Sequence, residues 1–433
     1  MKKCISFPVD DFNIFKIQML NWVNRFSIFC LLDNQQYNFS SPAFECLLAA
    51  GCSQKPAGKS KIEVNAGKAY ENLQHFYDTN KENWLFGHFG YDLKNETEKL
   101  SSEHTDGIGF SDLHFFVPEI VLQLDAKEVK IFCNSGAEEI YREIKLCPAV
   151  ITEKVKCNAV VKNKIEREAY IRIIKKLQQH ILRGDCYEIN FCQEFFAENA
   201  EIDPLYIYHR LTQLSPNPFA VLYKVKSRYC LCASPERYLK KAGNKVFSQP
   251  IKGTAKRNLE SNVEDEISKN YLLQSSKEKS ENVMVVDLVR NDLSRICKAG
   301  SVKVEELFGI YSFPQVHQMI STVSGEIEDG LNWIDCIRAT FPMGSMTGAP
   351  KKRVMELIEE YEITKRGLFS GAIGYVSPSG DFDFNVVIRS MFYNEADKYI
   401  SFQTGSGITY YSDAAMEYEE CMIKAEAMMK VLQ

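Results

Sequence analysis

The order of apolar segments near the end of the chain limits the fold most strongly. Residues 369–376, 382–392 and 399–403 each have the length and the β-branched and aromatic content of a strand. They follow one another through short polar turns, with no helical segment between them. Parallel neighbours need a long crossover connection, usually a helix, so this order favours an α+β fold with large antiparallel sheets over a doubly wound fold.

Helices and further strands are expected before this point. Apolar residues recur at helical spacing from Glu166, and Gly184 with Asp185 ends that helix. The other helices are expected at 261–276, 281–296, 331–339, 350–361 and 413–432, and the other strands at 186–195, 219–225, 228–233, 302–310 and 315–323. A connector at 147–165 precedes them. We expect an amino-terminal scaffold region at 1–160 and a catalytic region at 161–433, interwoven into one compact unit.

The composition argues against two classes of partner. The 433 residues carry a net charge of −5, and basic residues never cluster into a surface for nucleic acid. No window offers about 18 uninterrupted apolar residues, so no membrane span is expected. The first residues lack the features of a signal peptide, and the 14 cysteines contain no C-x-x-C pair. These features predict a cytoplasmic protein with reduced thiols and a small-molecule or protein partner.

The last expected helix carries two carboxylates at the edge of its buried face. At about 100° per residue, Glu417, Glu420 and Lys424 lie within about 60° of one another, beside an apolar stripe that includes Cys421. Two half-buried carboxylates repel each other, and a hard divalent cation with oxygen ligands relieves the repulsion. A surface salt-bridge cluster with Lys424 explains the same spacing, so the spacing alone leaves both interpretations open.

A lysine in a constrained segment is a candidate nucleophile. Lys252 follows Pro250 and Ile251 and precedes Gly253, which restricts its backbone. A nucleophilic lysine must be neutral, which requires a pKa lowered from about 10.4. Sixteen residues upstream, Glu236 follows an expected buried strand and is a candidate general acid with a raised pKa. The simpler alternatives are a solvated lysine in a turn for Lys252 and a charge at the end of a strand for Glu236.

Further residues are suited to binding carboxylate anions. Residues 344–351 combine glycine-flanked N–H groups with the positive end of an expected helix. Arg389 shares a face with apolar residues of an expected strand and needs an anionic partner, while 405–407 offer side-chain-free backbone after a strand. His317 can donate a hydrogen bond. Each has a simpler alternative: an ordinary helix cap for 344–351, an internal ion pair for Arg389, a plain turn for 405–407 and a structural role for His317.

The motifs from about Glu166 to the end of the chain resemble one family closely. They are similar to the chorismate-utilising enzymes of the anthranilate synthase component I and aminodeoxychorismate synthase component I group. The segments that carry the resemblance are GDCYEINFCQ, ASPERYL, QPIKGTAKR, ENVMVVDLVRNDLSR, FPQVHQMISTVSG, FPMGSMTGAPKKRVME, SGAIGYVSPSGDFDFNVVIRS and TGSGITYYSDAAMEYEECMIKAEAM. The first 160 residues resemble the family only loosely. The resemblance implies two large, mainly antiparallel sheets packed face to face and flanked by helices.

The resemblance also implies roles for individual residues. Glu281, Glu417 and Glu420 would bind Mg²⁺, which holds a carboxylate of chorismate. The remaining polar groups of chorismate would contact His317, Thr347, Gly348, Tyr375, Arg389, Gly405, Gly407 and Lys424. In the family mechanism Lys252 adds to C2 of the ring as the C4 hydroxyl leaves, with Glu236 as the acid, and ammonia then enters at C4.

Two positions discriminate within the family. Where Lys252 stands, anthranilate synthases typically carry alanine, so the lysine implies amination at C4 rather than C2. Where Glu188 stands, isochorismate and salicylate synthases carry a lysine that activates water, so the hydroxylating branch is disfavoured. Residues 31–34 read Leu-Leu-Asp-Asn instead of the Leu-Leu-Glu-Ser of tryptophan-regulated members, which argues against tryptophan inhibition.

The implied activity is Mg²⁺-dependent amination of chorismate to 4-amino-4-deoxychorismate, for 4-aminobenzoate and folate synthesis. The chain shows no glutaminase-like Cys and His arrangement, so ammonia is expected from a separate glutamine amidotransferase, component II. Two rival hypotheses remain. One is an anthranilate synthase component I, which releases pyruvate and anthranilate, and the other is a non-catalytic subunit that scaffolds a glutaminase.

Overall fold

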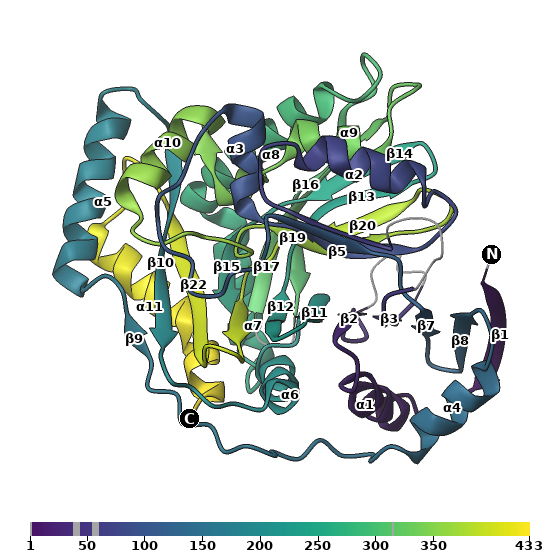
Figure 1. The fold of residues 1–433 in the computed structure, drawn as a ribbon. Coiled ribbons are helices and arrows are strands. Elements are labelled where there is room, and N and C mark those ends of the chain that lie inside the picture. The colour runs from purple at the N-terminus through teal and green to yellow at the C-terminus, as the bar shows by residue number, and fades with distance from the viewer. Residues whose placement is uncertain (1, 38–43, 54–59, 314–315) are drawn as a thin grey trace.

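Two antiparallel sheets packed face to face form the framework of the protein (Figure 1). The computed structural model describes residues 2–37, 44–53, 60–313 and 316–433. Within these residues one sheet has 12 strands and the other has 10. This confirms the α+β fold with large antiparallel sheets that the consecutive strands near the end of the chain predicted.

The 12-stranded sheet, called sheet A below, contains strands from both ends of the chain. In spatial order its strands are β1 (Lys3–Pro8), β8 (Glu128–Cys133), β7 (Ile120–Leu124), β3 (Cys46–Ala50), β2 (Ile28–Asp33), β11 (Phe219–Val225), β12 (Arg228–Ser234), β21 (Ser390–Asn394), β22 (Tyr399–Ile408), β10 (Glu188–Ala197) and β18 (Gly348–Ala349), with β9 (Lys162–Asn163) also paired to β10. The edge formed by β10 and β18 carries two of the motifs that resemble the family, GDCYEINFCQ and FPMGSMTGAPKKRVME.

The 10-stranded sheet, sheet B, is likewise assembled from distant segments. Its order is β15 (Ile251–Lys256), β17 (Val316–Glu326), β14 (Lys245–Gln249), β13 (Arg237–Ala242), β20 (Phe382–Asn385), β19 (Ala372–Val376), β5 (Leu85–Phe89), β6 (Leu113–Phe116) and β4 (Lys61–Val64), with β16 (Lys303–Ser312) paired to β17. Strand β15 lies at one end of this path, so its outer side is free to face the edge of sheet A.

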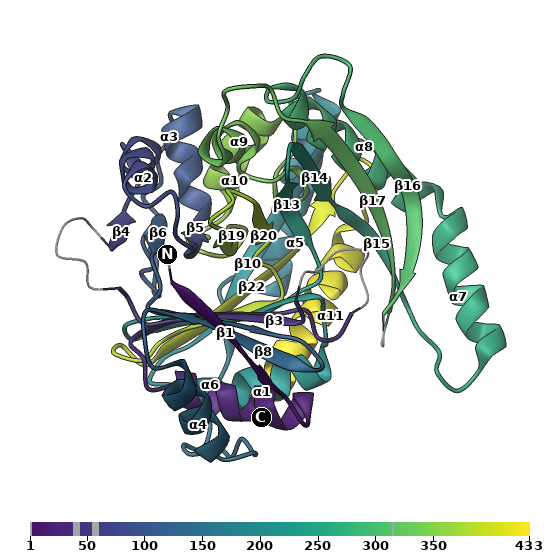
Figure 2. The same ribbon diagram turned by 90° about the vertical axis from the view of Figure 1, so that its right-hand side faces the viewer.

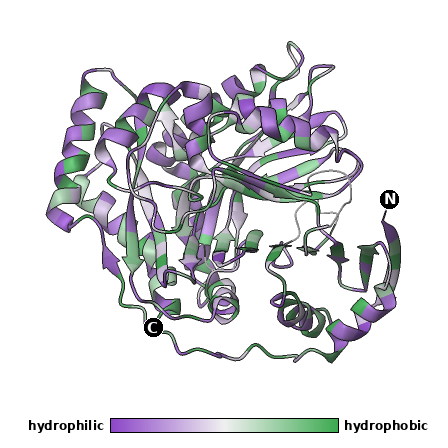
Figure 3. Ribbon diagram, viewed as in Figure 1, coloured by the Kyte–Doolittle hydropathy of each residue, from purple (hydrophilic) through white to green (hydrophobic). Residues whose placement is uncertain are grey.

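Sheet A buries both of its faces, and alternate residues enter different cores. Along β11 and β12, Val221 and Cys230 belong to the core between the two sheets, whereas Leu222 and Leu231 belong to the core beneath the outer helices. This explains why these strands read as continuous apolar runs instead of alternating ones. Figure 3 shows hydrophobic residues along the strands, while the helices alternate hydrophobic and hydrophilic residues as elements with one buried face do.

Helices cover the outer faces of both sheets (Figure 1). Those against sheet A are α1 (Phe12–Val23), α4 (Ala137–Leu146), α5 (Arg167–Leu182), α6 (Pro204–Leu214), α10 (Lys351–Tyr361) and α11 (Ala414–Val431). Those against sheet B are α2 (Ala69–Asp78), α8 (Ser276–Ser294) and α9 (Trp333–Thr340). The short α3 (Lys94–Glu98) follows a 3-10 turn, and α7 (Asn262–Gln274) projects beside β15 (Figure 2).

Three sequence-based expectations about strands require correction. The strand expected at 382–392 is two strands in different sheets, β20 and β21, joined by residues 386–389, where Arg389 has a φ of 53°. The shared strand face proposed for Arg389 is therefore wrong, because the chain changes sheets there. Gly405 and Gly407 lie inside β22 and not after a strand, and they pair with β10. The segment around Lys252 is itself a strand, and Gln315, expected to start a strand, lies outside the described residues.

We expect Leu231→Ala to lower the free energy of unfolding by about 2–5 kcal/mol, because the side chain is fully buried between sheet A and its helices. Urea unfolding measures the loss. Val263→Ala is the matched control, since Val263 on α7 is 72% exposed and its truncation should cost less than about 0.5 kcal/mol. Equal losses for the two variants would contradict the assignment of Leu231 to the core.

Candidate active site

A lysine and a glutamate from different sheets form a buried ion pair. Lys252 lies on β15 of sheet B, and Glu188 is the first residue of β10 in sheet A. The Lys252 Nζ atom lies 2.6 Å from Glu188 Oε1, and the two side chains are only 12% and 3% exposed. The pair therefore joins the adjacent edges of the two sheets.

Gly407 leaves the space that this pair occupies. It lies on β22 opposite Asn190 of β10. A Cβ atom at this position would lie 2.4 Å from Glu188 Oε1 and 2.8 Å from Lys252 Nζ, both too short for a carbon atom. Any side chain at position 407 would displace the ion pair.

The charges around Lys252 favour its protonated form. Burial alone lowers the pKa of Lys252, but the carboxylates of Glu188, Glu281 and Glu420 outweigh burial and raise the pKa above its ordinary value. The sequence-based expectation of a neutral amine with a lowered pKa is thus wrong for this arrangement, because glutamates that are distant in sequence surround the lysine. Lys252 must lose a proton before it can act as a nucleophile.

Glu236 has the properties expected of a general acid. It lies between β12 and β13 and is 4% exposed. Burial raises the pKa of Glu236 to about 7, against the lowering effects of Ser345, Lys252 and the backbone of Ile251. A carboxyl group with this pKa keeps its proton in a large fraction of molecules at neutral pH and can donate it. The raised pKa agrees with the general-acid interpretation of Glu236, and its catalytic role stays a prediction.

Two of the predicted metal ligands face the same ammonium group. The Oε1 atoms of Glu281 on α8 and Glu417 on α11 lie 3.9 and 3.8 Å from Lys277 Nζ. Glu281 Oε1 and Glu417 Oε2 are buried without a hydrogen-bond partner. Burial, opposed by Lys252 and reinforced by Glu188, raises the pKa of Glu281 to about 7. These helices therefore present buried carboxylates whose negative charge is poorly compensated.

The third predicted metal ligand has a cation of its own. Glu420 Oε1 lies 2.6 Å from Lys424 Nζ, which also donates a hydrogen bond of 2.9 Å to the carbonyl oxygen of Gly405. Burial would raise the pKa of Glu420, but Lys424, Lys277 and Lys252 lower it below its ordinary value. In the described part of the chain, no three His, Cys, Asp or Glu side chains converge closely enough to hold a metal ion.

The donor set nevertheless fits a hard cation by its chemistry. Carboxylate oxygens are the ligands that Mg²⁺ prefers, and the partnerless oxygens of Glu281 and Glu417 need positive charge. Lys277 supplies such charge only from nearly 4 Å. Its side chain is half exposed, so it is free to leave the carboxylates.

Arg389 is a cation without a counter-ion. Its guanidinium makes no ion pair or hydrogen bond with any residue in the described ranges, and burial lowers the pKa of Arg389 in spite of the nearby Glu420. It lines a cavity of about 310 Å³ together with Pro235, Thr254 and Gln318. A buried guanidinium calls for an anion. The described residues that line this cavity do not include Lys252, Glu236 or the predicted metal ligands.

Thr347 and Gly348 form a wall beside Glu188. Gly348 pairs with Ile189 and has a φ of 149°, and a Cβ atom there would lie 2.1 Å from the carbonyl oxygen of Glu188. The buried Thr347 hydroxyl donates to the carbonyl oxygens of Met343 and Gly344. The structure thus brings these two predicted site residues next to the ion pair.

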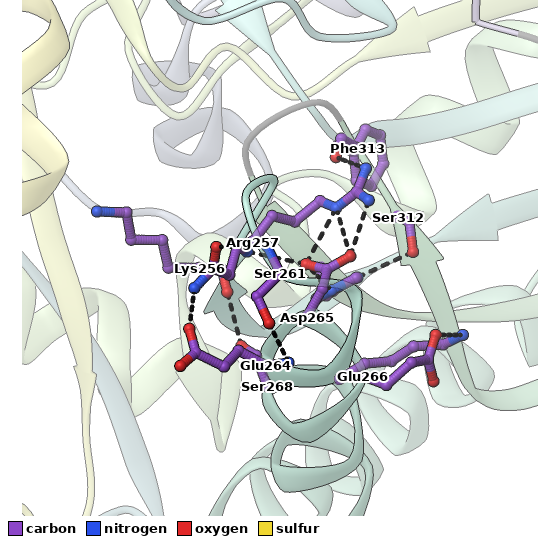
Figure 4. A network of polar contacts seen from close by, with 12 residues as sticks. Lys256, Arg257, Ser261, Glu264, Asp265, Glu266, Ser268, Ser312 and Phe313 are labelled. Carbon is purple, nitrogen blue, oxygen red and sulfur yellow. Dashed lines mark hydrogen bonds and ion pairs between the residues drawn. The ribbon is translucent and has the colours of Figure 1, made fainter.

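His317 is engaged within the protein. Its Nδ1 atom lies 2.9 Å from Ser312 Oγ and its Nε2 atom 3.1 Å from Asp265 Oδ1. Figure 4 shows Asp265 also held by Arg257, whose hydrogen bonds lower the pKa of Asp265. In this structure His317 links α7 to β17, and its contact with substrate stays a prediction.

Tyr375 lies apart from Lys252. It lines a second cavity of about 490 Å³ with Leu32, Arg237 and Asp383, and its ring packs against that of Trp84. The described residues around this cavity do not include the ion pair or Glu236. Its predicted contact with chorismate is therefore without support from this arrangement and stays a prediction.

A buried ion pair that sequence reasoning did not predict supports the site. Arg366 lies 2.6 Å from Glu362, and their side chains are 1% and 4% exposed. Arg366 donates to the carbonyl oxygens of Asn190 and Met346, and Glu362 accepts from the backbone N–H of Cys192. The pair holds β10 against the segment that contains Thr347. Its i,i+4 spacing was the only signal in the sequence, and that spacing also describes a surface pair.

The comparison with known sequences now decides the family. The sequence profile of the chorismate binding enzymes matches residues 29–430. The chain belongs to this family. It is 32% identical over 362 residues to aminodeoxychorismate synthase component 1 of Bacillus subtilis (strain 168), covering 80% of this chain and 76% of that protein. It is also 32% identical over 369 residues to anthranilate synthase component 1 of Aquifex aeolicus (strain VF5), covering 81% and 74%.

Solved structures of related enzymes share the fold. Anthranilate synthase component I from Streptococcus pneumoniae superimposes on this chorismate-binding enzyme with a TM-score of 0.73 and 26% identity, covering 94% of this chain and 92% of that one. The menaquinone-specific isochorismate synthase of Escherichia coli gives a TM-score of 0.76 at 15% identity, covering 100% and 95%, which shows the fold alone. In the described residues, none of the helices has the length and apolar content to cross a membrane.

We expect Gly407→Ala to lower the free energy of unfolding by about 3 kcal/mol or more, because the new methyl group separates two buried charges. Urea unfolding measures the change. Gly184→Ala is the control: it has a φ of 84° but no atom within 4 Å of the new Cβ, so only backbone strain of about 1–2 kcal/mol is expected. An equal effect of both substitutions would rule out crowding of the ion pair.

The raised pKa of Glu236 makes stability depend on pH. Between the ordinary value of 4.5 and about 7, the folded state binds this proton more tightly than the unfolded chain does. The free energy of unfolding therefore falls as pH rises through this window, by about 3 kcal/mol in all. We expect Glu236→Gln, which cannot ionise, to show a smaller decline in urea unfolding measured from pH 5 to pH 8. Identical pH slopes would contradict the raised pKa.

Proposed function

We propose that this enzyme aminates chorismate at C4 to give 4-amino-4-deoxychorismate. The observation that carries the proposal is the buried amine of Lys252, held at the junction of the sheets and within the electrostatic reach of Glu236. A lysine nucleophile and a protonated carboxyl group are the two groups needed to replace a ring hydroxyl through a covalent intermediate. Similarity to aminodeoxychorismate synthases supports the assignment.

The proposed steps use these two side chains in turn. Glu236 gives its proton to the C4 hydroxyl, which leaves as water. The amine of Lys252, once deprotonated, adds to C2 as the ring double bonds shift toward C4. Ammonia then forms a bond at C4 and the bond between C2 and Lys252 breaks, which returns the electron pair to the lysine. Nitrogen enters at C4 because the lysine occupies C2.

Glu281, Glu417 and Glu420 are the residues that would hold Mg²⁺. The bound ion would supply positive charge for a carboxylate of chorismate. The partnerless oxygens of Glu281 and Glu417 support this proposal, as does the position of the Lys277 ammonium between the two carboxylates.

Arg389 and Lys424 would balance the charge of chorismate, which is a dianion. The absence of a counter-ion for Arg389 among the described residues supports it as the contact for a substrate carboxylate. Backbone groups at Thr347, Gly348 and Gly405 lie on strands or turns that border the ion pair. Cations and N–H groups that are fixed before substrate binds stabilise developing charge without reorganisation.

Ammonia is the proposed nucleophile, and a separate glutamine amidotransferase is its proposed source. Glu188 supplies a carboxylate at the position where isochorismate and salicylate synthases of the resembled family carry a water-activating lysine. The similar proteins are named component 1, which supports a second component as partner. We place the reaction in the cytoplasm, where its product serves 4-aminobenzoate and folate synthesis.

The activity is tested by incubating the purified chain with chorismate, ammonium and Mg²⁺, then adding a lyase that converts 4-amino-4-deoxychorismate to 4-aminobenzoate. Chromatography is expected to show 4-aminobenzoate. Fluorescent anthranilate formed without the lyase would instead assign amination at C2. Chorismate left intact at saturating Mg²⁺ would contradict any synthase activity.

We expect Lys252→Ala to lower kcat for amination at C4 by on the order of 100-fold or more, because the covalent route is removed. The coupled assay measures the loss. Lys256→Ala is the matched control, since Lys256 lies on the same strand but is exposed, and it should retain full activity. Undiminished amination at C4 by the Lys252 variant would exclude the lysine as nucleophile.

A further inference from the structure

Glu188 is the only residue in the described ranges that forms a direct hydrogen bond or ion pair with the amine of Lys252. Glu281 and Glu420 also affect this amine, but only through longer-range charge interactions. Lysine has a long side chain with several rotatable bonds, so its own backbone does not fix where the amine lies. The Glu188 carboxylate is therefore the one group in the described ranges that holds the amine by direct contact.

The carboxylate of Glu188 is itself held firmly by sheet A. Glu188 is paired with Ala349 of β18, and the preceding residue, Tyr187, donates a backbone hydrogen bond to the carbonyl oxygen of Ala349. Gly348 packs against the carbonyl oxygen of Glu188, and Gly407 borders its Oε1 atom. A side chain that starts from such a backbone and is 3% exposed has little freedom to move.

We propose that Glu188 is a positioning residue that fixes the carbon at which this enzyme places nitrogen. The inference rests on the proposed function, in which Lys252 must add at C2 to leave C4 for ammonia. An amine displaced from C2 leaves this carbon open, and ammonia can then add at C2 itself as the ring double bonds shift and the protonated C4 hydroxyl leaves as water. A misplacement of about 1 Å can lower a rate by about 100-fold.

The role requires a hydrogen-bond acceptor at the position of Oε1 more than it requires a charge. Glutamine has the same length as glutamate and offers a carbonyl oxygen as acceptor, whereas leucine fills a similar volume without any acceptor. A purely structural role of Glu188 would make both substitutions destabilising and would leave the site of amination unchanged. The two variants therefore separate positioning from packing.

The test compares Glu188→Gln and Glu188→Leu in the amination assay with saturating ammonium and Mg²⁺. We expect Glu188→Gln to keep kcat within about threefold of the unmodified enzyme. We expect Glu188→Leu to lower kcat for the C4 product by at least about tenfold, with a smaller change in KM, and to raise the share of nitrogen found at C2. Thermal unfolding of each variant verifies that it is folded. Unchanged kcat and product ratio in a folded Glu188→Leu enzyme would overturn the proposal.

A second measurement does not depend on turnover. Modification of Lys252 by trinitrobenzenesulfonate, followed by peptide mass spectrometry at one pH without chorismate, reports how freely the amine moves and reacts. We expect at least about tenfold faster modification in Glu188→Leu than in the unmodified protein, because the amine loses its partner. Equal rates would overturn the anchoring of Lys252 by Glu188. The unmodified enzyme could make no aminated product while its Lys252 is still labelled more slowly than Lys252 of Glu188→Leu. This outcome would contradict the proposed function and support the anchoring of Lys252 by Glu188.

Discussion

The contact between Lys252 and Glu188 is made across the two sheets, and the arrangement of the other charged groups depends on it. Each partner is held by the edge of a different sheet, so the pair forms only when β10 and β15 come together. Removing Lys252 would leave the Glu188 carboxylate without its ion-pair partner in a largely buried place. Gly407 and Gly348 lack side chains at the points where these atoms need the room.

The site combines buried charges that the protein alone does not neutralise. Glu281 and Glu417 have oxygens without hydrogen-bond partners, and the Arg389 guanidinium makes no ion pair or hydrogen bond with a described residue. Burying such groups costs free energy, so their presence favours binding over stability as the explanation. The proposed dianionic substrate and divalent cation would carry the complementary charges, and the binding of each would then favour the binding of the other.

Much of the fold was predictable because it follows from the order of apolar segments. The split between β20 and β21 was not, since an apolar run looks the same whether it stays in one sheet or passes to the next. The family resemblance implies that Glu236, Glu281 and Glu417 belong to one site, whereas their spacing in the sequence does not. The raised pKa of Lys252 was not predicted for a related reason: its partner Glu188 is 64 residues away in sequence. Nothing in the sequence distinguishes Lys277 from the other lysines of its polar stretch, so its position between two carboxylates was not predicted.

The short link between β20 and β21 has a mechanical consequence. Because residues 386–389 are the whole connection between a strand of sheet B and a strand of sheet A, they span the gap between the sheets with little slack. The backbone N–H of Val386 is bonded to the carbonyl oxygen of Glu236, and the carbonyl oxygen of Arg389 accepts from Ala233. Any shift of one sheet relative to the other is thereby transmitted to the acid and to the guanidinium at once, so the two groups move as parts of a single linkage.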